Sequence, residues 1–309
     1  VFESTVFPGV TEELCVPILE NGSGLKFCND FNVGYSPERI NPGDKENTVE
    51  KINKLLSGSN KKTVELLKKI YKSFLKSDLV VCETIKIAEA AKVLENTQRD
   101  VNIALINEFY AVLSALEIDT HKVIEAAATK WNFHKYSPGL VGGHCIGIDP
   151  YYFAHKAGTV GIKTNLLLAA RNTNEQLSSV IVEKLIKELI SNRKNILHET
   201  ILIVGAAYKE NCSDFRNTKV VDVFHKLQSY GLNVDIFDPL LDSKKFENQY
   251  NIKLVRSLEK TYKTAIFLVP HDEFNRKFWD RLIAENNLNL VYDFKDILNW
   301  SEKKVTIMK

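Results

Sequence analysis

A long stretch without helix breakers constrains the fold more than any other feature of this sequence. No Gly or Pro occurs between Ser59 and Ser137. Within this stretch, residues 84–116 are rich in Ala, Glu, Lys and Leu, which have high helix propensities. One helix over these residues would have about nine turns, far more than an average helix. We therefore expect a long helix that forms the spine between two parts of the protein.

Alternating strand and helix patterns flank this spine helix, and they predict an α/β fold. Thr11 is expected to cap a helix near the start, and Asp119 a helix that reaches about residue 129. With a further helix at 164–192, the middle section should be entirely helical. Before it, the expected elements are strands at 31–35, 55–58 and 79–82 and a helix at 61–75. After it, the expected elements are strands at 200–204, 233–237, 265–270 and 290–293 and a helix at 219–230.

The composition is that of an ordinary globular protein with room for two or three domains. The chain has 309 residues, of which 44% are hydrophobic and 26% charged. Its net charge of +2 provides no strong field for binding nucleic acid or an anionic membrane. No apolar run reaches the roughly 18 residues that indicate a membrane span, and no signal peptide is evident. We therefore expect a cytoplasmic protein that binds neither nucleic acid nor membranes.

The cysteine pattern argues against both a zinc site and a disulfide framework. The chain has an odd number of cysteines, without CxxC spacing. They should all be free thiols, and no metal is expected. The five residues are Cys15, Cys28, Cys82, Cys145 and Cys212.

A glycine-rich segment at 142–150 carries the strongest candidate for a nucleophile. Gly142 and Gly143 allow positive φ and close approach to a ligand, and they place Cys145 at the tip of a turn. Asp149 follows close enough to share a site with the thiol, and a proline fixes the exit of the loop. The alternative is a tight turn with a buried, inert cysteine, and for these residues in isolation that alternative is favoured.

Two further candidate groups lie earlier in the chain. Lys92 and Asn96 are one helical turn apart, so a cation and an amide donor project from one face and can stabilise an oxyanion. Glu38 follows a predicted strand, where open α/β sheets place ligands, although an ion pair with Arg39 is the alternative. Thr5 lies in a turn, where its hydroxyl either contacts a ligand or bonds its own backbone.

The segment Gly-Gly-His-Cys-Ile-Gly-Ile-Asp-Pro-Tyr-Tyr resembles the catalytic-cysteine loop of the UDP-glucose/GDP-mannose dehydrogenase family. It is most similar to the branch that oxidises UDP-N-acetylglucosamine or UDP-N-acetylgalactosamine for capsule, Vi and O-antigen polysaccharides. Further motifs occur in the family's order along essentially the whole chain. They are Glu3-Ser-Thr-Val, Pro37-Glu38, residues 88–99, Gly205-Ala-Ala-Tyr-Lys, Asp214-Phe-Arg and His271-Asp-Glu-Phe.

The resemblance implies an NAD-dependent, four-electron oxidation of the sugar C6 alcohol to the uronic acid. It implies Cys145 as the nucleophile, Lys92 and Asn96 as oxyanion donors, and Asp149, Glu38 and Thr5 as handlers of water and protons. The implied substrate-binding residues are Arg39, Arg171, Gly142, Gly143, His144, Tyr208 and Lys209. The implied cofactor-binding residues are Thr5, Glu38, Cys145 and Arg216. For Arg171, a salt bridge at the surface or in an interface is an equally good interpretation.

The resemblance also implies a domain organisation. Residues 1–83 are expected to be the second half of a Rossmann-like NAD-binding domain, and residues 84–195 a central helical domain with the cysteine loop. Residues 196–309 are expected to form a Rossmann-like UDP-sugar-binding domain. In such a protein the long helix packs against its copy in a second subunit, so a homodimer through the central domain is expected.

One motif of the family is missing from these residues. The family begins with a strand, GxGxxG and a helix that binds the pyrophosphate. Because that motif does not occur in this sequence, we expect these residues alone to bind UDP-sugar but to bind NAD poorly. The sequence is then either part of a longer enzyme or a truncated product. The alternative function is a UDP-sugar-binding and dimerisation module without catalysis.

Overall fold

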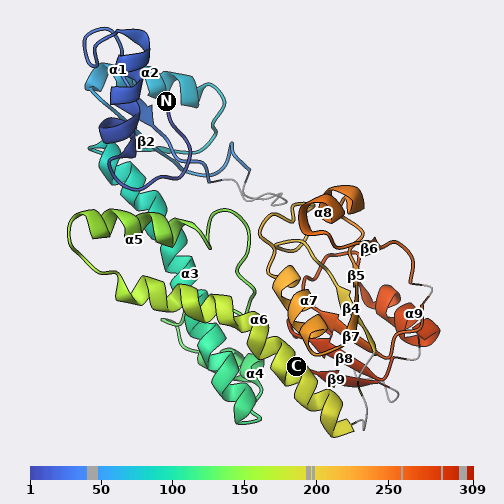
Figure 1. Cartoon of the computed structure of the whole chain (residues 1–309). Coiled ribbons are helices and arrows are strands. Elements are labelled where there is room, and N and C mark those ends of the chain that lie inside the picture. The colour runs from blue at the N-terminus through green and yellow to red at the C-terminus, as the bar shows by residue number, and fades with distance from the viewer. Residues whose placement is uncertain (40–47, 193–195, 197–198, 259, 287, 299–304) are drawn as a thin grey trace. The chain divides into compact units, whose positions relative to one another are not determined.

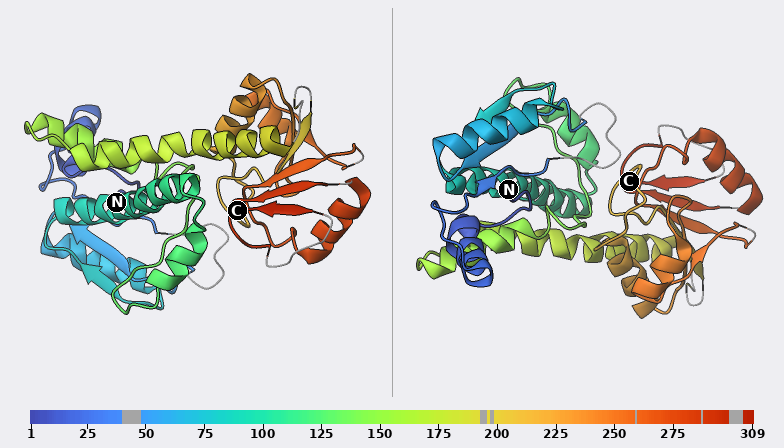
Figure 2. Two further views of the ribbon diagram at one scale, coloured as in Figure 1. Left: turned by 90° about the horizontal axis from the view of Figure 1, so that it is seen from below. Right: turned by 90° about the horizontal axis from the view of Figure 1, so that it is seen from above.

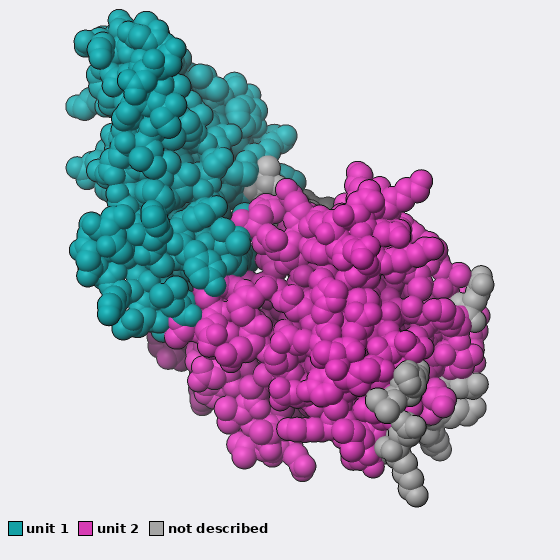
Figure 3. All heavy atoms as spheres, viewed as in Figure 1, with its two compact units in different colours: residues 1–99, 145–168 teal, residues 100–144, 169–309 magenta. Residues whose placement is uncertain are grey.

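The computed structural model describes the chain except residues 40–47, 193–195, 197–198, 259, 287 and 299–304 (Figure 1). The described chain divides into two compact units, coloured separately in Figure 3. Unit 1 contains Val1–Arg99 and Cys145–Leu168, and unit 2 contains Asp100–His144 and Ala169–Lys309. The chain crosses between the units at three points, inside α3 (Ile85–Ala115), in the cysteine loop and inside α6 (Asn165–Asn192). The three-domain division at 83/84 and 195/196 stays a prediction.

The long helix is confirmed as α3 (Ile85–Ala115), and it runs through the boundary between the units. The other predicted helices of the middle section are also present, as α4 (Thr120–Ala127) and α6 (Asn165–Asn192). Asp119 caps α4 as predicted, by accepting hydrogen bonds from the N–H groups of His121 and Lys122. No strand occurs in the described residues between the start of α3 and the end of α6.

Unit 1 contains a small sheet with the strand order β1-β2-β3. The strands are β1 (Gly34–Tyr35), β2 (Lys54–Gly58) and β3 (Leu79–Val81). Strands β2 and β3 are parallel, whereas β1 is antiparallel to β2. Helix α2 (Lys61–Lys72) covers the sheet because its apolar residues Leu67 and Tyr71 pack in one cluster with Leu56 of β2. Strand β1 is shorter than predicted, since Phe31 forms a local bridge with Phe27 instead.

The predicted cap at Thr11 is wrong. Thr11 lies inside η1 (Val10–Cys15), a helical segment that continues into α1 (Val16–Ser23), and Gly9 precedes it with a φ of 103°. The N–H groups of Gly9 and Thr11 instead donate to the carboxylate of Glu89 on α3, at 2.6 and 2.9 Å. The cap is therefore supplied by a residue far along the chain, which local sequence rules do not detect.

A short helix that the sequence analysis did not predict follows the cysteine loop. This helix, α5 (Asp149–Thr159), has Pro150 in its first turn. Proline is well tolerated there because the N–H that it lacks would have no partner within the helix. The proline that was expected to end the loop therefore also begins a helix.

Unit 2 contains a sheet of six strands that are all parallel, in the order β6-β5-β4-β7-β8-β9. The predicted strands are confirmed as β4 (Thr200–Val204), β5 (Asn233–Phe237), β7 (Thr264–Phe267) and β8 (Leu290–Asp293). The strands that were not predicted are β6 (Leu254–Val255) and β9 (Thr306–Met308). Both are too short to show a periodic pattern.

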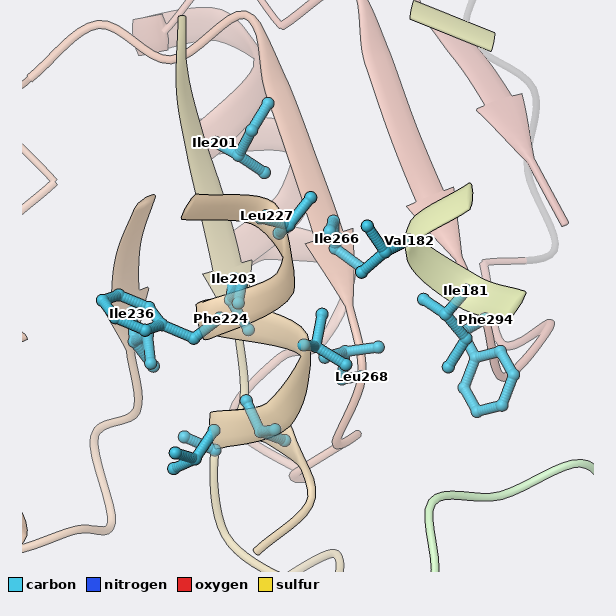
Figure 4. Packing of buried hydrophobic residues seen from close by; sticks show 14 of the residues in the cluster. Ile181, Val182, Ile201, Ile203, Phe224, Leu227, Ile236, Ile266, Leu268 and Phe294 are labelled. Atoms are coloured by element: carbon cyan, nitrogen blue, oxygen red, sulfur yellow. The ribbon is translucent and has the colours of Figure 1, made fainter. Parts of the chain in front are cut away.

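Helices cover both faces of this sheet (Figure 2). On one face, α7 (Val220–Ser229) and the second half of α6 pack over Ile201 and Ile203 of β4 (Figure 4). On the other face, α9 (Arg276–Asn286) packs over Leu202 and Val204. Burial on both faces explains the uninterrupted apolar run in β4. Helix α8 (Ser243–Tyr250) adds Phe246 to the hydrophobic cluster on the α7 face.

Two neighbouring residues of α6 test this packing. The Leu189 side chain belongs to the hydrophobic cluster on the α7 face and is 1% exposed, whereas Ile190 is 60% exposed. We expect Leu189→Ala to lower the free energy of unfolding by about 2–5 kcal/mol, because it leaves a cavity. Ile190→Ala should change it by no more than about 0.5 kcal/mol. Urea unfolding of both variants checks this, and equal losses would contradict the orientation of α6.

Candidate functional site

Lys92 and Asn96 lie on one face of α3, as predicted, and both side chains are buried. The amide of Asn96 donates a hydrogen bond of 2.5 Å to the carboxylate of Asp149. Asp149 is the first residue of α5 and is itself 1% exposed. This buried contact therefore joins the middle of α3 to the helix that follows Cys145, within unit 1.

The ammonium of Lys92 makes no hydrogen bond or ion pair with any residue that the structure describes. Burial lowers the pKa of Lys92, and the nearby charge of Arg39 lowers it further. Negative charges on Cys145 and Asp149 act in the opposite direction. Lys92 is thus a buried cation in the electrostatic field of the thiol and the carboxylate, and it is available to stabilise a third negative group.

Cys145 lies in a tight turn that leads directly into α5. Its carbonyl oxygen accepts hydrogen bonds from the N–H groups of Ile148 and Asp149, at 3.0 and 2.9 Å. The residue is half-buried, whereas Cys212 is buried. This partial exposure differs from the fully buried, inert cysteine that was the alternative. None of the five cysteines forms a disulfide bond in the structure.

Glu38 and Arg39 are placed by contacts with different elements. The guanidinium of Arg39 pairs with Glu95 of α3, and not with the side chain of Glu38, so the predicted alternative of a Glu38–Arg39 ion pair is wrong. Glu38 is exposed, and its N–H donates to the carbonyl of Glu3 at 3.1 Å. Lys54 donates to the carbonyls of Ser36 and Pro37, at 3.3 Å each. The last part of the predicted loop, from Ile40 to Gly43, lies outside the described residues.

Thr5 belongs to a segment that buried residues hold in place. Its side chain is half-buried and makes no hydrogen bond to the described part of the chain, so the turn-bonded alternative is not observed. Tyr35, fully buried, donates to the carbonyl of the preceding Ser4 at 3.0 Å. Burial raises the pKa of Tyr35, and the charges of Glu89 and Asp149 raise it further. Tyr35 therefore lies in the same electrostatic environment as the candidate site.

Glu89 is a buried residue of this region whose structural role the sequence analysis missed. Its side chain is wholly buried, and its carboxylate binds the two backbone N–H groups of the Gly9 and Thr11 turn. It lies close before Lys92 on α3. An acidic residue within a helix rich in Ala was a detectable signal, but its spacing alone does not identify a partner eighty residues earlier.

In unit 2, the glycines before Cys145 pack against the segment 208–217. A Cβ atom on Gly142 would lie 2.5 Å from the carbonyl oxygen of Asn217. Gly143 has a φ of +79°, and a Cβ atom there would lie 2.9 Å from the ring of Tyr208. Gly142 therefore permits close backbone approach, and Gly143 permits both positive φ and contact with the aromatic ring.

Aromatic and charged side chains gather around this contact. The ring centroids of His144 and Tyr208 are 6.4 Å apart, and the Nε2 atom of His144 lies 3.8 Å from the carboxylate of Asp214. Lys209 lies 5.7 Å from the centroid of the Tyr208 ring. Arg216 binds Asp214 through two nitrogens, and these hydrogen bonds lower the pKa of Asp214. The cluster brings together four of the residues expected to bind substrate or cofactor, namely His144, Tyr208, Lys209 and Arg216. Its cations suit a diphosphate.

Arg171 is occupied by carboxylates in the structure. It is 1% exposed, and its guanidinium binds Asp100 of α3 at 2.5 Å and Glu175 of its own helix. Asn174 donates to the same carboxylate oxygen of Asp100 at 2.7 Å. Arg171 therefore forms a salt bridge, but a buried one within the chain and not the predicted one at the surface or in an interface. Contact between Arg171 and substrate stays a prediction.

The turn after β4 does not resemble a dinucleotide-binding turn in its contacts. The N–H groups of Ala206 and Ala207 both donate to the carboxylate of Asp238, at 2.7 and 3.1 Å. In a dinucleotide-binding turn, such groups face the pyrophosphate. Here these N–H groups are bound to Asp238, which agrees with the interpretation that Gly205-Ala-Ala is not an NAD motif.

Neither a metal-ligand cluster nor a membrane-spanning helix occurs in the described residues. They contain no group of three His, Cys, Asp or Glu side chains arranged to hold a metal ion. None of the helices in this part of the chain has the length and apolar character to cross a bilayer.

Three profiles of one protein family match almost the whole chain. They are the NAD binding domain, the central domain and the UDP binding domain of the UDP-glucose/GDP-mannose dehydrogenase family. The matched residues are 1–75, 86–176 and 202–300, respectively.

Characterised proteins and solved structures show the same similarity. The UDP-N-acetyl-D-glucosamine 6-dehydrogenase of Salmonella typhi is 44% identical over 309 residues, covering 99% of this chain and 73% of that protein. The enzyme of the same name from Pseudomonas aeruginosa is 45% identical, covering 97% and 71%. The structure of a UDP-D-ManNAc dehydrogenase from Pyrococcus horikoshii has a TM-score of 0.85 at 27% identity, covering 99% and 71%.

The buried charge of Lys92 leads to a test of stability. Because burial lowers its pKa, the ammonium is less favourable in the folded than in the unfolded state. We expect Lys92→Met to raise the melting temperature at neutral pH by about 2 °C or more. The gain should be complete below the folded pKa and fade as the pH rises toward the ordinary lysine value of 10.5.

The matched control lies on the same helix. Lys86 is exposed and pairs with Glu13 at 2.8 Å, so Lys86→Met should change the melting temperature by no more than about 1 °C, and not upward. Differential scanning calorimetry across a pH series compares the two variants. A lower melting temperature for Lys92→Met than for the wild type would show that the ammonium has a stabilising partner.

Proposed function

Because this chain belongs to the UDP-glucose/GDP-mannose dehydrogenase family, we propose that it is an NAD-dependent UDP-N-acetylhexosamine 6-dehydrogenase. The reaction oxidises the C6 alcohol of the sugar to a carboxylate. The names of two relatives at 44% and 45% identity favour UDP-N-acetyl-D-glucosamine as the substrate. The product would supply surface polysaccharide synthesis, with the enzyme in the cytoplasm, where NAD and nucleotide sugars are available.

One observation carries this proposal: a buried ammonium and a buried amide share a helix face next to the turn of a half-buried cysteine. Lys92 has no ion-pair partner among the described residues, and Asn96 is positioned through Asp149. A purely structural role would leave a buried cation without compensation, which is costly. A negative charge that develops on the substrate would supply the compensation during the reaction.

The chemistry of the chain's own residues follows from these positions. Lys92 and Asn96 would stabilise negative charge on the C6 oxygen. The Cys145 thiolate would attack the C6 aldehyde and form a thiohemiacetal, whose oxidation leaves a thioester. Asp149 and Glu38 would activate the water that hydrolyses the thioester, releasing the uronate and the thiolate. All of these residues belong to unit 1.

The residues present also fit contact with NAD, which accepts the hydrides removed from C6 when it is bound. Thr5 offers a hydroxyl that makes no hydrogen bond within the described chain, on a segment that Tyr35 anchors. Residues 1–75 match the family's NAD binding domain. We assign Thr5 and Glu38 to the cofactor on this basis, whereas cofactor contacts of Cys145 and Arg216 stay predictions from the family resemblance.

The cluster in unit 2 is proposed to bind the nucleotide part of the substrate. Lys209 and Arg216 supply positive charge for the diphosphate, and Tyr208 and His144 supply aromatic surface. The UDP binding domain profile includes Tyr208, Lys209 and Arg216. Arg39 and Arg171, both bound to carboxylates in the structure, would contact substrate only if they exchanged those partners.

A homodimer is proposed from an apolar stripe on α3. Leu105, Phe109 and Val112 of α3, with Leu116 directly after its last residue, recur at helical spacing, and each is between 52% and 61% exposed. An exposed stripe of this kind on a long helix requires a partner surface. A second copy of the same helix would provide a self-complementary one.

Cys145→Ser tests the catalytic assignment. In a chain joined to the GxGxxG-containing segment that the family carries, the variant, assayed with NAD and UDP-N-acetyl-D-glucosamine, should lose at least about a hundredfold in uronate formation, because a hydroxyl at its ordinary pKa is a poor substitute for a thiolate. Mass spectrometry of the product measures this. Cys28→Ser, at an exposed cysteine, is the control and should keep the wild-type rate. Uronate formation at the wild-type rate by Cys145→Ser would remove Cys145 from its role.

Phe109→Glu tests the dimer. Phe109 is 52% exposed in the single chain. In the dimer a carboxylate at this position would be buried without a partner, so the dissociation constant of the dimer should rise at least about tenfold. Sedimentation equilibrium measures the change. Glu108→Gln, at the exposed neighbouring position, should leave the assembly unchanged. A wild-type chain that sediments as a monomer at every concentration would contradict the dimer itself.

A further inference from the structure

Three loops of unit 2 meet in a buried pair of side chains, Asp238 and His271. Ala206 and Ala207 follow β4, Asp238 follows β5 and His271 follows β7, and these three strands are neighbours in the parallel sheet. The His271 Nε2 atom lies 2.9 Å from the Asp238 carboxylate, and both side chains have no exposed surface. The pair therefore joins the carboxyl ends of the central strands.

The hydrogen bonds around this pair fix its protonation pattern. The Nδ1 atom of His271 accepts the N–H of Asn211 at 2.8 Å, so the ring proton is on Nε2 and is donated to Asp238. The same carboxylate accepts the N–H groups of Ala206 and Ala207, and its second oxygen accepts that of Leu240 at 2.9 Å. The bonding capacity of both side chains is thus used within the protein, which makes neither available as a ligand for substrate.

The pair anchors one short segment at both of its ends. The segment begins at Ala206, bound to Asp238, and ends at Asn211, bound to His271. Asn211 has a φ of 53°, and it exchanges two hydrogen bonds of 3.0 and 2.9 Å with Asp272. Tyr208 and Lys209 lie between these two anchors. Their positions therefore depend on side chains from two other loops.

This arrangement also explains where a nucleotide can bind. In open α/β sheets, ligands occupy the carboxyl edge where the strand order reverses, which here is beside β4. There the N–H groups of Ala206 and Ala207, in the turn after β4, already donate to the carboxylate of Asp238. A ligand must then use the half-buried side chains of Tyr208 and Lys209, which lie between the two anchors of the segment.

We propose that Asp238 and His271 are positioning residues for the nucleotide-sugar site, which act by holding Tyr208 and Lys209 in the geometry that binds the UDP group. This inference rests on the proposed function, because it takes the UDP group as the ligand of the segment. Neither residue touches the substrate in this proposal. The segment also packs on Gly143, since a Cβ atom on Gly143 would lie 2.9 Å from the ring of Tyr208.

Three substitutions of His271 separate its two hydrogen bonds. His271→Gln keeps a donor toward Asp238, His271→Asn keeps an acceptor for the N–H of Asn211, and His271→Leu keeps neither. Titration calorimetry of the full chain with UDP at low temperature, where all variants are folded, measures the affinity. We expect His271→Leu to weaken UDP binding by about tenfold or more, and the Gln and Asn variants by less.

A control variant separates positioning from general loss of stability. Leu282 is 1% exposed in the cluster on the α9 face and has no part in the segment. Leu282→Ala should lower the melting temperature but leave the UDP affinity within about twofold of the wild type, because the site itself is unchanged.

The outcomes are distinct. A wild-type chain that does not bind UDP contradicts the proposed function. A wild-type chain that binds UDP while folded His271→Leu binds it equally well overturns the positioning role alone. If His271→Leu does not fold, the Gln and Asn variants decide, and wild-type affinity in both overturns the proposal. Equal loss of UDP affinity in Leu282→Ala and His271→Leu also overturns it.

Discussion

The burial of polar side chains along α3 is the constraint on which much of the structure depends. Glu89 holds the turn at Gly9 and Thr11, and Asn96 holds the start of α5 through Asp149. Further along the same helix, the amide of Asn107 forms two hydrogen bonds with the backbone of Gly139, in the segment that leads to the cysteine loop. A buried polar group left without its partner would lower the stability of the protein by about 1–3 kcal/mol, so these hydrogen bonds fix the positions of the attached segments.

Lys92 differs from these groups because its burial is not compensated by an ion pair within the described chain. A folded protein ordinarily pairs a buried cation or neutralises it. Retaining one next to a cysteine turn is consistent with a site where function opposes stability. The proposed nucleotide site differs, because the hydrogen bonds of its buried pair, Asp238 and His271, are satisfied within the protein.

The sequence was sufficient for elements whose signal is local. Helices α3, α4 and α6 and strand β4 were predicted because long periodic runs, a capping Asp119 and an uninterrupted apolar segment each carry their own information. Helix α5 was missed because its first turn, with Pro150, reads locally as the end of a loop. Strand β9 was missed because so few residues show no periodicity, and their pairing with β8 is what makes them a strand.

For the site, the sequence by itself determined the residue types and their spacing: a cysteine after two glycines, and a lysine and an asparagine one turn apart on a helix. Family resemblance then assigned roles to them. Only the tertiary structure decided that Glu89 caps a helix from a distant position, that Arg39 pairs with Glu95 and that Asp238 fills the turn after β4. The physical reason is that a hydrogen bond or an ion pair depends on distance in space. Local sequence specifies the donors and acceptors, whereas packing of the whole chain selects which of them meet.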